Sequence, residues 1–297
     1  MLVYISPMSG YTDFSYRQIM KKFGPDLMYT EMVNSNLLSQ KNSNTLEKIM
    51  RISNDENTGI QLFGSDIENL YNNFIYLNEL GYHDLLLNMG CPQPKILKNG
   101  SGANMLERYD EIQYLLSSLK EKNISVSIKI RDSINTMKYF NLANKLNIPY
   151  LCLHPRTKEQ GFNGFANHNI TKKLSSLDRN FKLIANGDIF SLEDYRKISK
   201  YNIDGVMLAR GIISNPYLIK EIKEDKKIIR SLEEDKNLII EHINLLVEDK
   251  GEKKALLEIN KFLIEYFKFL NKEDMKSILV EKDYNRKIKL IKEVKLP

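Results

Sequence analysis

Short apolar runs alternate with segments of helical period along roughly the first 210 residues of the chain. Several runs are apolar nearly throughout, as strands are when both faces of a parallel sheet are buried. The predicted strands are Val3–Met8, Leu27–Met32, Gly59–Phe63, Asp84–Met89, Ser125–Ile130, Pro149–His154, Lys182–Asn186 and Gly205–Ala209. Between them, apolar residues recur every three or four positions in Asp66–Leu80, Tyr109–Leu119 and Leu192–Ile198, which predicts amphipathic helices.

Strand and helix alternating through eight units are typical of a (β/α)8 barrel. A doubly wound open sheet is the main alternative, but the glycine-rich fingerprint expected after its first strand is missing. After Pro216 the pattern changes to charged helical stretches such as Leu238–Val247 and Ala255–Leu270. We therefore expect an α/β protein with a TIM barrel at residues 1–230 and a small all-helical domain at residues 231–297.

Composition limits the class of protein without naming a function. Hydrophobic residues make up 42% of the chain, enough for a large core, and the net charge of +6 permits a nucleic-acid partner without requiring one. The two cysteines form no CxxC pair, and Cys152 alternates with leucines as a core residue does. With no signal sequence and no apolar run long enough to span a membrane, we expect a cytoplasmic protein.

Polar residues cluster where the predicted strands end. Barrel enzymes place their active sites at that rim, and phosphate commonly binds the loops after strands seven and eight. Each residue alone has an ordinary structural explanation, but their joint appearance at successive strand ends favours a site with a phosphate-bearing cofactor. The residues are Ser6–Gly10, Glu31, Gln61, Asn88, Cys91, Lys129, Arg131, His154, Arg156, Asn186–Asp188 and Ala209–Gly211.

The most informative segment is the end of the fourth predicted strand. There, Asn88 and Gly90 precede Cys91, and a glycine pair follows at Gly100 and Gly102. A thiol at the rim of a barrel can donate a proton to a substrate, provided that another group supplies the electrons.

The motifs at these strand ends resemble those of the tRNA-dihydrouridine synthases, which are flavoenzymes with an FMN-binding barrel and a C-terminal helical domain. They occur in the family's order and span essentially the whole barrel. The matching segments are SPMSGYTDFSYR, TEMV, IQLFGSD, LNMGCPQPKI, GSGANML, SIKIR, LHPRT, ANGDI and VMLARG.

The resemblance implies a role for each matching residue. Cys91 is implied as the catalytic proton donor. Three residues are predicted to contact the substrate: Asn88, Arg131 and Arg156. The flavin ring and its polar edge are expected to meet Pro7, Met8, Ser9, Gln61 and Lys129. The flavin phosphate is expected at His154, Asn186, Gly187, Asp188, Ala209 and Arg210.

The resemblance also implies a reaction. The protein is expected to be an oxidoreductase acting on CH–CH bonds, in which hydride passes from reduced FMN to C6 of a tRNA uridine and Cys91 protonates C5. NADPH would re-reduce the flavin. We expect a monomer that binds tRNA through the barrel rim and the helical tail, without a metal or a membrane partner.

The chain departs from the family at a few positions. The family usually has alanine at Ser9, glycine at Pro155 and Ala209, and histidine at Phe262. The first three are small residues in backbone-contact positions and are compatible with FMN binding, although Pro155 is expected to alter the loop after the sixth predicted strand.

Two alternatives remain open. A dihydroorotate dehydrogenase-like enzyme also sets a thiol or hydroxyl beside FMN, but a small substrate requires no helical tail. An RNA-binding protein without catalysis would not require Cys91, Lys129 and His154 together.

Overall fold

A computed structural model describes residues 1–52 and 57–296 of the chain. Its strands match the predicted ones to within one residue at each end, except that the first ends at Ile5 rather than at Met8 and the second is interrupted. They are β1 (Leu2–Ile5), β2 (Met28–Tyr29), β3 (Val33–Asn34), β4 (Thr58–Phe63), β5 (Leu85–Met89), β6 (Val126–Arg131), β7 (Tyr150–His154), β8 (Lys182–Asn186) and β9 (Gly205–Leu208).

All strand pairs are parallel, in the order β1-β9-β8-β7-β6-β5-β4-β2, with β3 also pairing with β4. The ring closes between its first and last members through a bridge from Tyr4 to Leu27. Two backbone bonds support the bridge: Ile5 N–H donates to Leu27 O at 2.8 Å, and Asp26 N–H to Val3 O at 2.9 Å. The predicted TIM barrel is therefore confirmed.

The prediction of one continuous strand over Leu27–Met32 is wrong, because the segment breaks between β2 and β3. The Thr30 hydroxyl donates to the Glu31 carbonyl at 2.9 Å, and the Glu31 carboxylate accepts the Gly10 N–H at 2.6 Å. Polar side chains that bond to nearby backbone in this way compete with ladder pairing.

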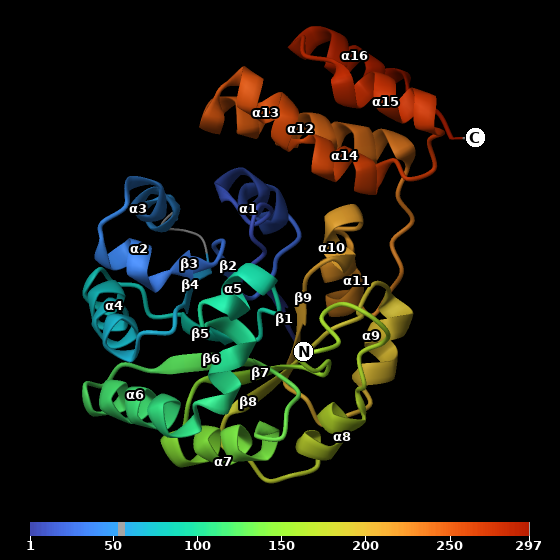
Figure 1. Ribbon diagram of the computed structural model, residues 1–297. Coiled ribbons are helices and arrows are strands. Elements are labelled where there is room, and N and C mark those ends of the chain that lie inside the picture. Colours follow the sequence, from blue (N-terminus) through green and yellow to red (C-terminus); the bar gives the residue numbers. More distant parts are fainter. Residues whose placement is uncertain (53–56, 297) are drawn as a thin grey trace. The chain divides into compact units, whose positions relative to one another are not determined.

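The helices between the strands include the three predicted ones, which are α4 (Ile67–Glu79), α6 (Tyr109–Glu121) and α9 (Leu192–Ile198). Figure 1 shows α4 and α6 outside the strands. Their apolar stripes are buried, as the helical period requires. These helices are α2 (Ser35–Ser39), α3 (Ser43–Met50), α4 (Ile67–Glu79), α5 (Pro94–Lys98), the 3-10 helix η1 (Gly102–Glu107), α6 (Tyr109–Glu121), α7 (Thr136–Leu146), α8 (Asn169–Ser175) and α9 (Leu192–Ile198).

Inward-facing side chains fill the barrel below its mouth. Cys152 lies in this core, as predicted, together with Tyr4 and Met207. The hydroxyl groups of Tyr29 and Tyr150 hydrogen-bond to each other there, and burial raises the pKa of both well above its usual range. The barrel interior is thus a packed core in which the Tyr29 and Tyr150 hydroxyl groups satisfy one another.

The chain forms two compact units: the barrel (1–12 and 25–209) and a helical unit (13–24 and 210–297). The domain boundary predicted at residue 230 falls inside the second unit. That residues 231–297 bind tRNA stays a prediction. The helices of this unit are α1 (Phe14–Lys21), α10 (Gly211–Ser214), α11 (Leu218–Glu224), α12 (Leu232–Lys250), α13 (Glu252–Glu258), α14 (Asn260–Tyr266), α15 (Lys272–Val280) and α16 (Tyr284–Glu293).

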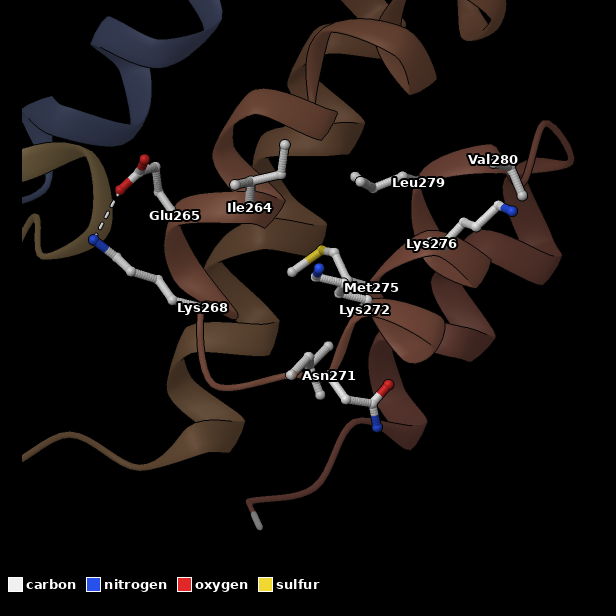
Figure 2. Close-up of a pocket in the computed structure, with 10 residues that line it drawn as sticks. Ile264, Glu265, Lys268, Asn271, Lys272, Met275, Lys276, Leu279 and Val280 are labelled. Atoms are coloured by element: carbon white, nitrogen blue, oxygen red, sulfur yellow. Dashed lines mark ion pairs between the residues drawn. The ribbon is translucent and has the colours of Figure 1, made fainter.

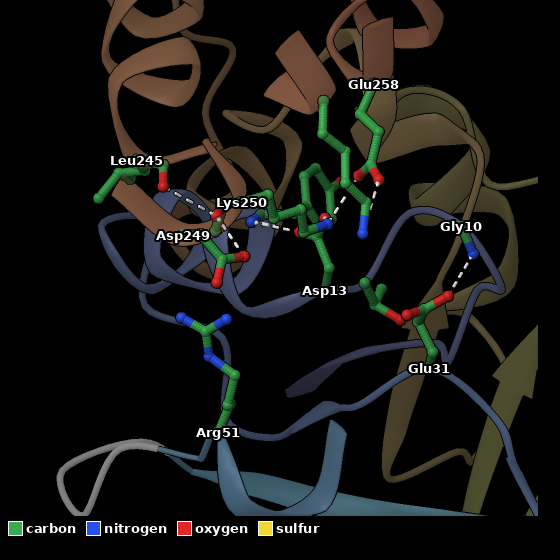
Figure 3. A network of polar contacts seen from close by, with 12 residues as sticks. Gly10, Asp13, Glu31, Arg51, Leu245, Asp249, Lys250 and Glu258 are labelled. Atoms are coloured by element: carbon green, nitrogen blue, oxygen red, sulfur yellow. Dashed lines mark hydrogen bonds and ion pairs between the residues drawn. The ribbon is translucent and has the colours of Figure 1, made fainter. Parts of the chain in front are cut away.

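Helix α1 belongs to the helical unit through both polar and aromatic contacts. Asp13 caps α1 by accepting the Tyr16 N–H at 2.9 Å, and Lys250 bridges Asp13 to Glu258 (Figure 3). Burial alone would raise the pKa of Asp13, but the Lys250 ammonium group and the capping bond bring it below its ordinary value. The Tyr16 ring also stacks on Phe262 with 5.2 Å between centroids.

A shallow groove of about 480 Å³ lies between α14 and α15 (Figure 2). The residues that line the groove are largely apolar, among them Met275 and Leu279. The lining also includes Lys268, Lys272 and Lys276. Of these, Lys268 pairs with Glu265 at 2.9 Å.

A buried lysine joins the last helices of this unit. Lys287 of α16 is fully buried and donates to Asn260 Oδ1 at 2.7 Å and to Leu256 O at 3.1 Å. Burial lowers its pKa to about 8, and the Glu281 charge opposes this only in part.

Among the described residues, no helix has the length and apolar character needed to cross a membrane.

We expect the Tyr29–Tyr150 hydroxyl pair to behave as one unit in stability measurements. Tyr150→Phe removes the partner of a buried hydroxyl and should lower the free energy of unfolding by about 1–3 kcal/mol. The Tyr29→Phe/Tyr150→Phe double variant should lose less than the sum of the two single losses. Urea titrations of the four proteins check this, and additive losses would contradict the coupling.

We expect Lys287 to make stability depend on pH in the alkaline range. The pKa of Lys287 is about 8 in the folded protein and 10.5 for an ordinary lysine. Between these two pH values the unfolded state binds more protons than the folded state, so the free energy of unfolding rises with pH. The slope is at most about 1.4 kcal/mol per pH unit. Lys287→Met should lack this rise, and the difference between the two proteins in denaturant titrations isolates it from other titrating groups.

Candidate functional site

The parallel ring brings the polar strand ends together at one mouth of the barrel. Asn88 of β5 pairs in register with Lys129 of β6, and Arg131 of β6 with His154 of β7. Asn186 is the last residue of β8, the strand next to β7. Residues that are far apart in the sequence thus form one continuous polar surface.

Asn88 is buried, and both the nitrogen and the oxygen of its side-chain amide form hydrogen bonds. Its Nδ2 donates to Gln61 Oε1 at 2.7 Å and contacts Met32 Sδ at 3.0 Å. Its Oδ1 accepts the N–H groups of Gly90 and Cys91, each at 3.0 Å. This pair of bonds folds the chain after β5 into a tight turn and fixes the position of the Cys91 backbone.

Gly102 allows the following segment to pack against Cys91. Its φ is +64°, and a Cβ there would lie 2.6 Å from Cys91 O. The neighbouring Ala103 N–H donates to the same carbonyl at 3.0 Å. A side chain at Gly102 would displace the cysteine loop, so the glycine noted in the sequence has a structural role beside the thiol.

The Cys91 side chain is half-buried, and its environment favours the neutral thiol. Burial raises its pKa, while a backbone hydrogen bond at Gln93 and the charges of Lys129 and Arg131 act in the opposite sense without reversing the shift. A thiol with a raised pKa stays protonated at neutral pH, which suits a proton donor better than a nucleophile.

Lys129 projects into the mouth and is oriented by Asn186. Its Nζ donates to Asn186 Oδ1 at 2.9 Å, and Asn186 Nδ2 donates in turn to Met207 O at 2.6 Å. Burial of the ammonium group lowers the pKa of Lys129, and the nearby positive charge of Arg131 lowers it further. Among the described residues, no carboxylate forms an ion pair with Lys129, so this cation is available to an electron-rich group.

Gln61 leaves a buried donor unused. The residue is fully buried, its Oε1 accepts from Asn88, and its Nε2 has no hydrogen-bond partner among the residues that the structure describes. An unsatisfied buried amide group costs about 1–3 kcal/mol. Such an atom is expected where a bound molecule supplies the missing acceptor.

His154 presents a donor toward Gly187. Its Nδ1 accepts the Arg156 N–H at 3.3 Å. Burial is the main cause that lowers the pKa of His154 to about 2, and the charges of Lys129, Arg131 and Arg156 lower it further. The Arg156 contact at Nδ1 favours the neutral tautomer that carries its proton on Nε2. At Gly187, with φ +107°, a Cβ would lie 3.3 Å from this nitrogen, so the glycine keeps the space beside the imidazole open.

Arg131 is buried in contacts within the protein. Its Nε donates to Gly90 O at 2.8 Å, and its Nη1 to Thr157 O at 2.9 Å and Gly161 O at 2.6 Å. The guanidinium therefore ties the loop that carries Cys91 to the loop after β7. Its predicted contact with substrate stays a prediction.

Arg156 and Asp188 form a bidentate pair at 2.8 and 2.7 Å, with the arginine side chain almost fully buried. Because the Asp188 carboxylate is engaged in this way, its predicted phosphate contact would have to use the backbone. Both this role and the predicted substrate contact of Arg156 stay predictions.

The first predicted flavin-binding segment forms a fixed loop after β1. Pro7 is buried and Ser9 is exposed. The Met8 N–H donates to Thr12 Oγ1 at 3.0 Å, and the Gly10 N–H donates to Glu31 Oε1 (Figure 3). Two side chains thus hold the loop from its two ends.

Two predicted residues lie at the end of β9. Ala209 follows the strand and is half-exposed at the rim of the barrel unit. Arg210 is the next residue and begins the second part of the helical unit. Its predicted phosphate contact stays a prediction.

Sequence reasoning did not single out Met32 or His168 as site residues. His168 Nε2 donates to Gly187 O at 3.0 Å, which fixes the carbonyl group of that glycine. His168 lies in a loop without periodicity, so no local signal marked it. Glu31 was noted as the end of a strand, and its bond to Gly10 follows from the fold alone.

In the part of the chain that the structure describes, no group of histidine, cysteine, aspartate and glutamate side chains is arranged to hold a metal ion.

Comparison with known proteins gives concordant results. The profile of the family "Dihydrouridine synthase (Dus)" matches residues 4–292. The chain is 28% identical to a probable tRNA-dihydrouridine synthase of Aquifex aeolicus, over 99% of this chain and 96% of that protein. It is 29% identical to tRNA-dihydrouridine synthase B of Pasteurella multocida, over 85% of this chain and 80% of that protein.

Solved structures support the same architecture. The old yellow enzyme from Trypanosoma cruzi aligns with a TM-score of 0.55 at 10% sequence identity, covering 77% of this chain and 89% of that chain. This similarity concerns the fold alone. The family profile covers nearly the whole chain, and the chain therefore belongs to the dihydrouridine synthase family.

Proposed function

We propose that this protein reduces specific uridines in tRNA to 5,6-dihydrouridine, with FMN as cofactor and NADPH as reductant. The observation that carries the proposal is the arrangement of Cys91, Asn88, Lys129 and Gln61 at one barrel mouth in a chain of this family. The curated relatives are named for dihydrouridine synthesis in tRNA, which supports the same substrate class.

The mouth fits the polar edge of a flavin ring. The unpartnered Gln61 Nε2 can donate to a ring carbonyl, and Lys129 can place its positive charge beside the ring nitrogen and oxygen atoms. Pro7, Met8 and Ser9 would line the ring. When bound, the flavin supplies a hydride to C6 of the uracil, and a nearby cation favours its reduced, anionic form.

The phosphate end of the cofactor would lie by the ends of β7 and β8. His154 is neutral with a proton on Nε2, and Gly187 leaves the adjacent space open. A phosphate bound by this donor would also face the backbone after Asn186. Ala209 and Arg210, which follow β9, are proposed to complete the site.

Cys91 is proposed as the acid of the reaction. Its S–H bond breaks as a C–H bond forms at C5, so uracil gains one hydride and one proton and the C5–C6 double bond becomes single. The raised pKa of the thiol keeps this proton in place until the uracil arrives. Asn88 holds the backbone of Cys91 and is proposed to contact the uracil.

The target uridine must leave its stack to reach the barrel mouth. Unstacking costs a few kcal/mol and is least costly in a flexible loop, which fits a tRNA loop as substrate. The proposal is tested with purified protein, NADPH and tRNA from a strain that lacks dihydrouridine. Site-specific dihydrouridine in nucleoside mass spectrometry is expected. NADPH oxidation without this product would instead indicate a small-molecule reductase.

Cys91→Ala should retain bound FMN and tRNA affinity but turn over about 10²–10⁴-fold more slowly, because general-acid catalysis contributes that much. In the wild-type enzyme, turnover should fall as pH rises through the raised thiol pKa, and the variant should lose this alkaline limb. Single-turnover assays from pH 6 to 10 measure both effects. Full activity of Cys91→Ala would contradict the assignment.

Lys129→Met should make the reduction potential of the bound flavin more negative, by about 30 mV for each 1.4 kcal/mol of lost charge stabilisation. Photoreduction against a reference dye measures the shift. The matched control is Lys120→Met, which removes an exposed lysine at the end of α6 and should leave the potential unchanged. Equal potentials for the wild type and Lys129→Met would contradict the proposed place of the ring.

A further inference from the structure

Three phenylalanines are exposed on two neighbouring loops at the barrel mouth. Phe162 and Phe165 follow β7, and Phe190 follows β8. The side chain of Phe165 is 88% exposed, whereas Phe140 of α7 is buried. Single exposed apolar residues are common, but neighbouring aromatic side chains beside a reaction site indicate a binding surface.

The loop after β7 is fixed to the reaction site itself. Arg131 donates to Gly90 O, next to Cys91, and through another nitrogen to Thr157 O and Gly161 O. The same guanidinium lies over the Phe162 ring at 5.4 Å from its centroid. One buried cation therefore holds the exposed aromatic loop beside the cysteine.

The backbone is held on both sides of Phe165. Gly164 O accepts from Arg156 Nη2 at 2.6 Å, and the Ala166 N–H donates to Asp188 Oδ2 at 2.8 Å. Arg156 and Asp188 are themselves joined by a bidentate ion pair. An exposed aromatic ring on an anchored backbone loses little conformational freedom when it binds a partner, which is typical of an interaction anchor.

We propose that Phe165 stacks on an unpaired nucleobase next to the uridine that enters the barrel mouth. The inference rests on the proposed function and adds a contact to the RNA substrate. A uridine drawn out of its stack leaves a neighbouring base with an exposed face, and aromatic side chains bind such faces with little regard to sequence. Arg131 joins the loop that carries Phe165 to Gly90, so the loop backbone is held next to the segment that carries Cys91.

The test compares Phe165→Ala and Phe165→Trp with the wild-type holoenzyme. Loss of one base–aromatic stack should raise Kd and KM for unmodified tRNA about 5- to 100-fold in Phe165→Ala, with a smaller change in kcat. Phe165→Trp should retain affinity. Because no charge is removed, the slope of log Kd against log salt should be the same in the wild type and Phe165→Ala.

The matched control is Tyr114→Ala, which removes an aromatic side chain that is 69% exposed on helix α6. It should leave Kd for tRNA unchanged, and all variants should keep bound FMN and the wild-type rate of NADPH oxidation.

Unchanged Kd and KM in Phe165→Ala, with a wild type that forms dihydrouridine, would overturn the stacking contact alone. An equal loss in Tyr114→Ala, or a changed salt slope, would also overturn it. A wild type that forms no dihydrouridine would instead count against the proposed function.

Discussion

Parallel pairing around a closed ring is the constraint on which the rest of the barrel unit depends. Every strand must run in the same direction, so every carboxyl end reaches the same mouth. The bridge from Tyr4 to Leu27 completes the ring and removes the free edge that an open sheet would leave. The buried Tyr29–Tyr150 pair and the apolar layer around it then fill the interior, so chemistry is confined to the mouth.

Two buried arginines turn irregular loops into fixed parts of the site. Arg131 binds carbonyl oxygens on two separate loops, and Arg156 joins the loop after β7 to Asp188 after β8. Burying a guanidinium is costly unless its donors are satisfied, and both side chains have several partners. The loops can therefore hold Cys91 and Gly187 in place although they have little regular secondary structure.

The same physical effect, burial, prepares different groups for different tasks. It raises the pKa of Cys91 and lowers the pKa of His154, because in each case the neutral form is favoured away from water. The mouth thus offers the neutral Cys91 thiol after β5, the Lys129 ammonium on β6 and the neutral His154 imidazole at the end of β7. This combination suits a reaction in which an electron-rich ring and a proton donor must meet one substrate.

The sequence by itself determined the barrel, seven of its eight strand positions as continuous strands, and the residues that end them, because burial of a parallel sheet imposes a local apolar pattern. It did not determine the break at Thr30, the membership of α1 in the helical unit, or the bonds of Arg131 and His168. These depend on partners tens of residues away, and local periodicity carries no information about which distant polar groups will meet. Only the tertiary structure decided them, because a buried donor or acceptor must be satisfied by whatever group the fold brings within reach.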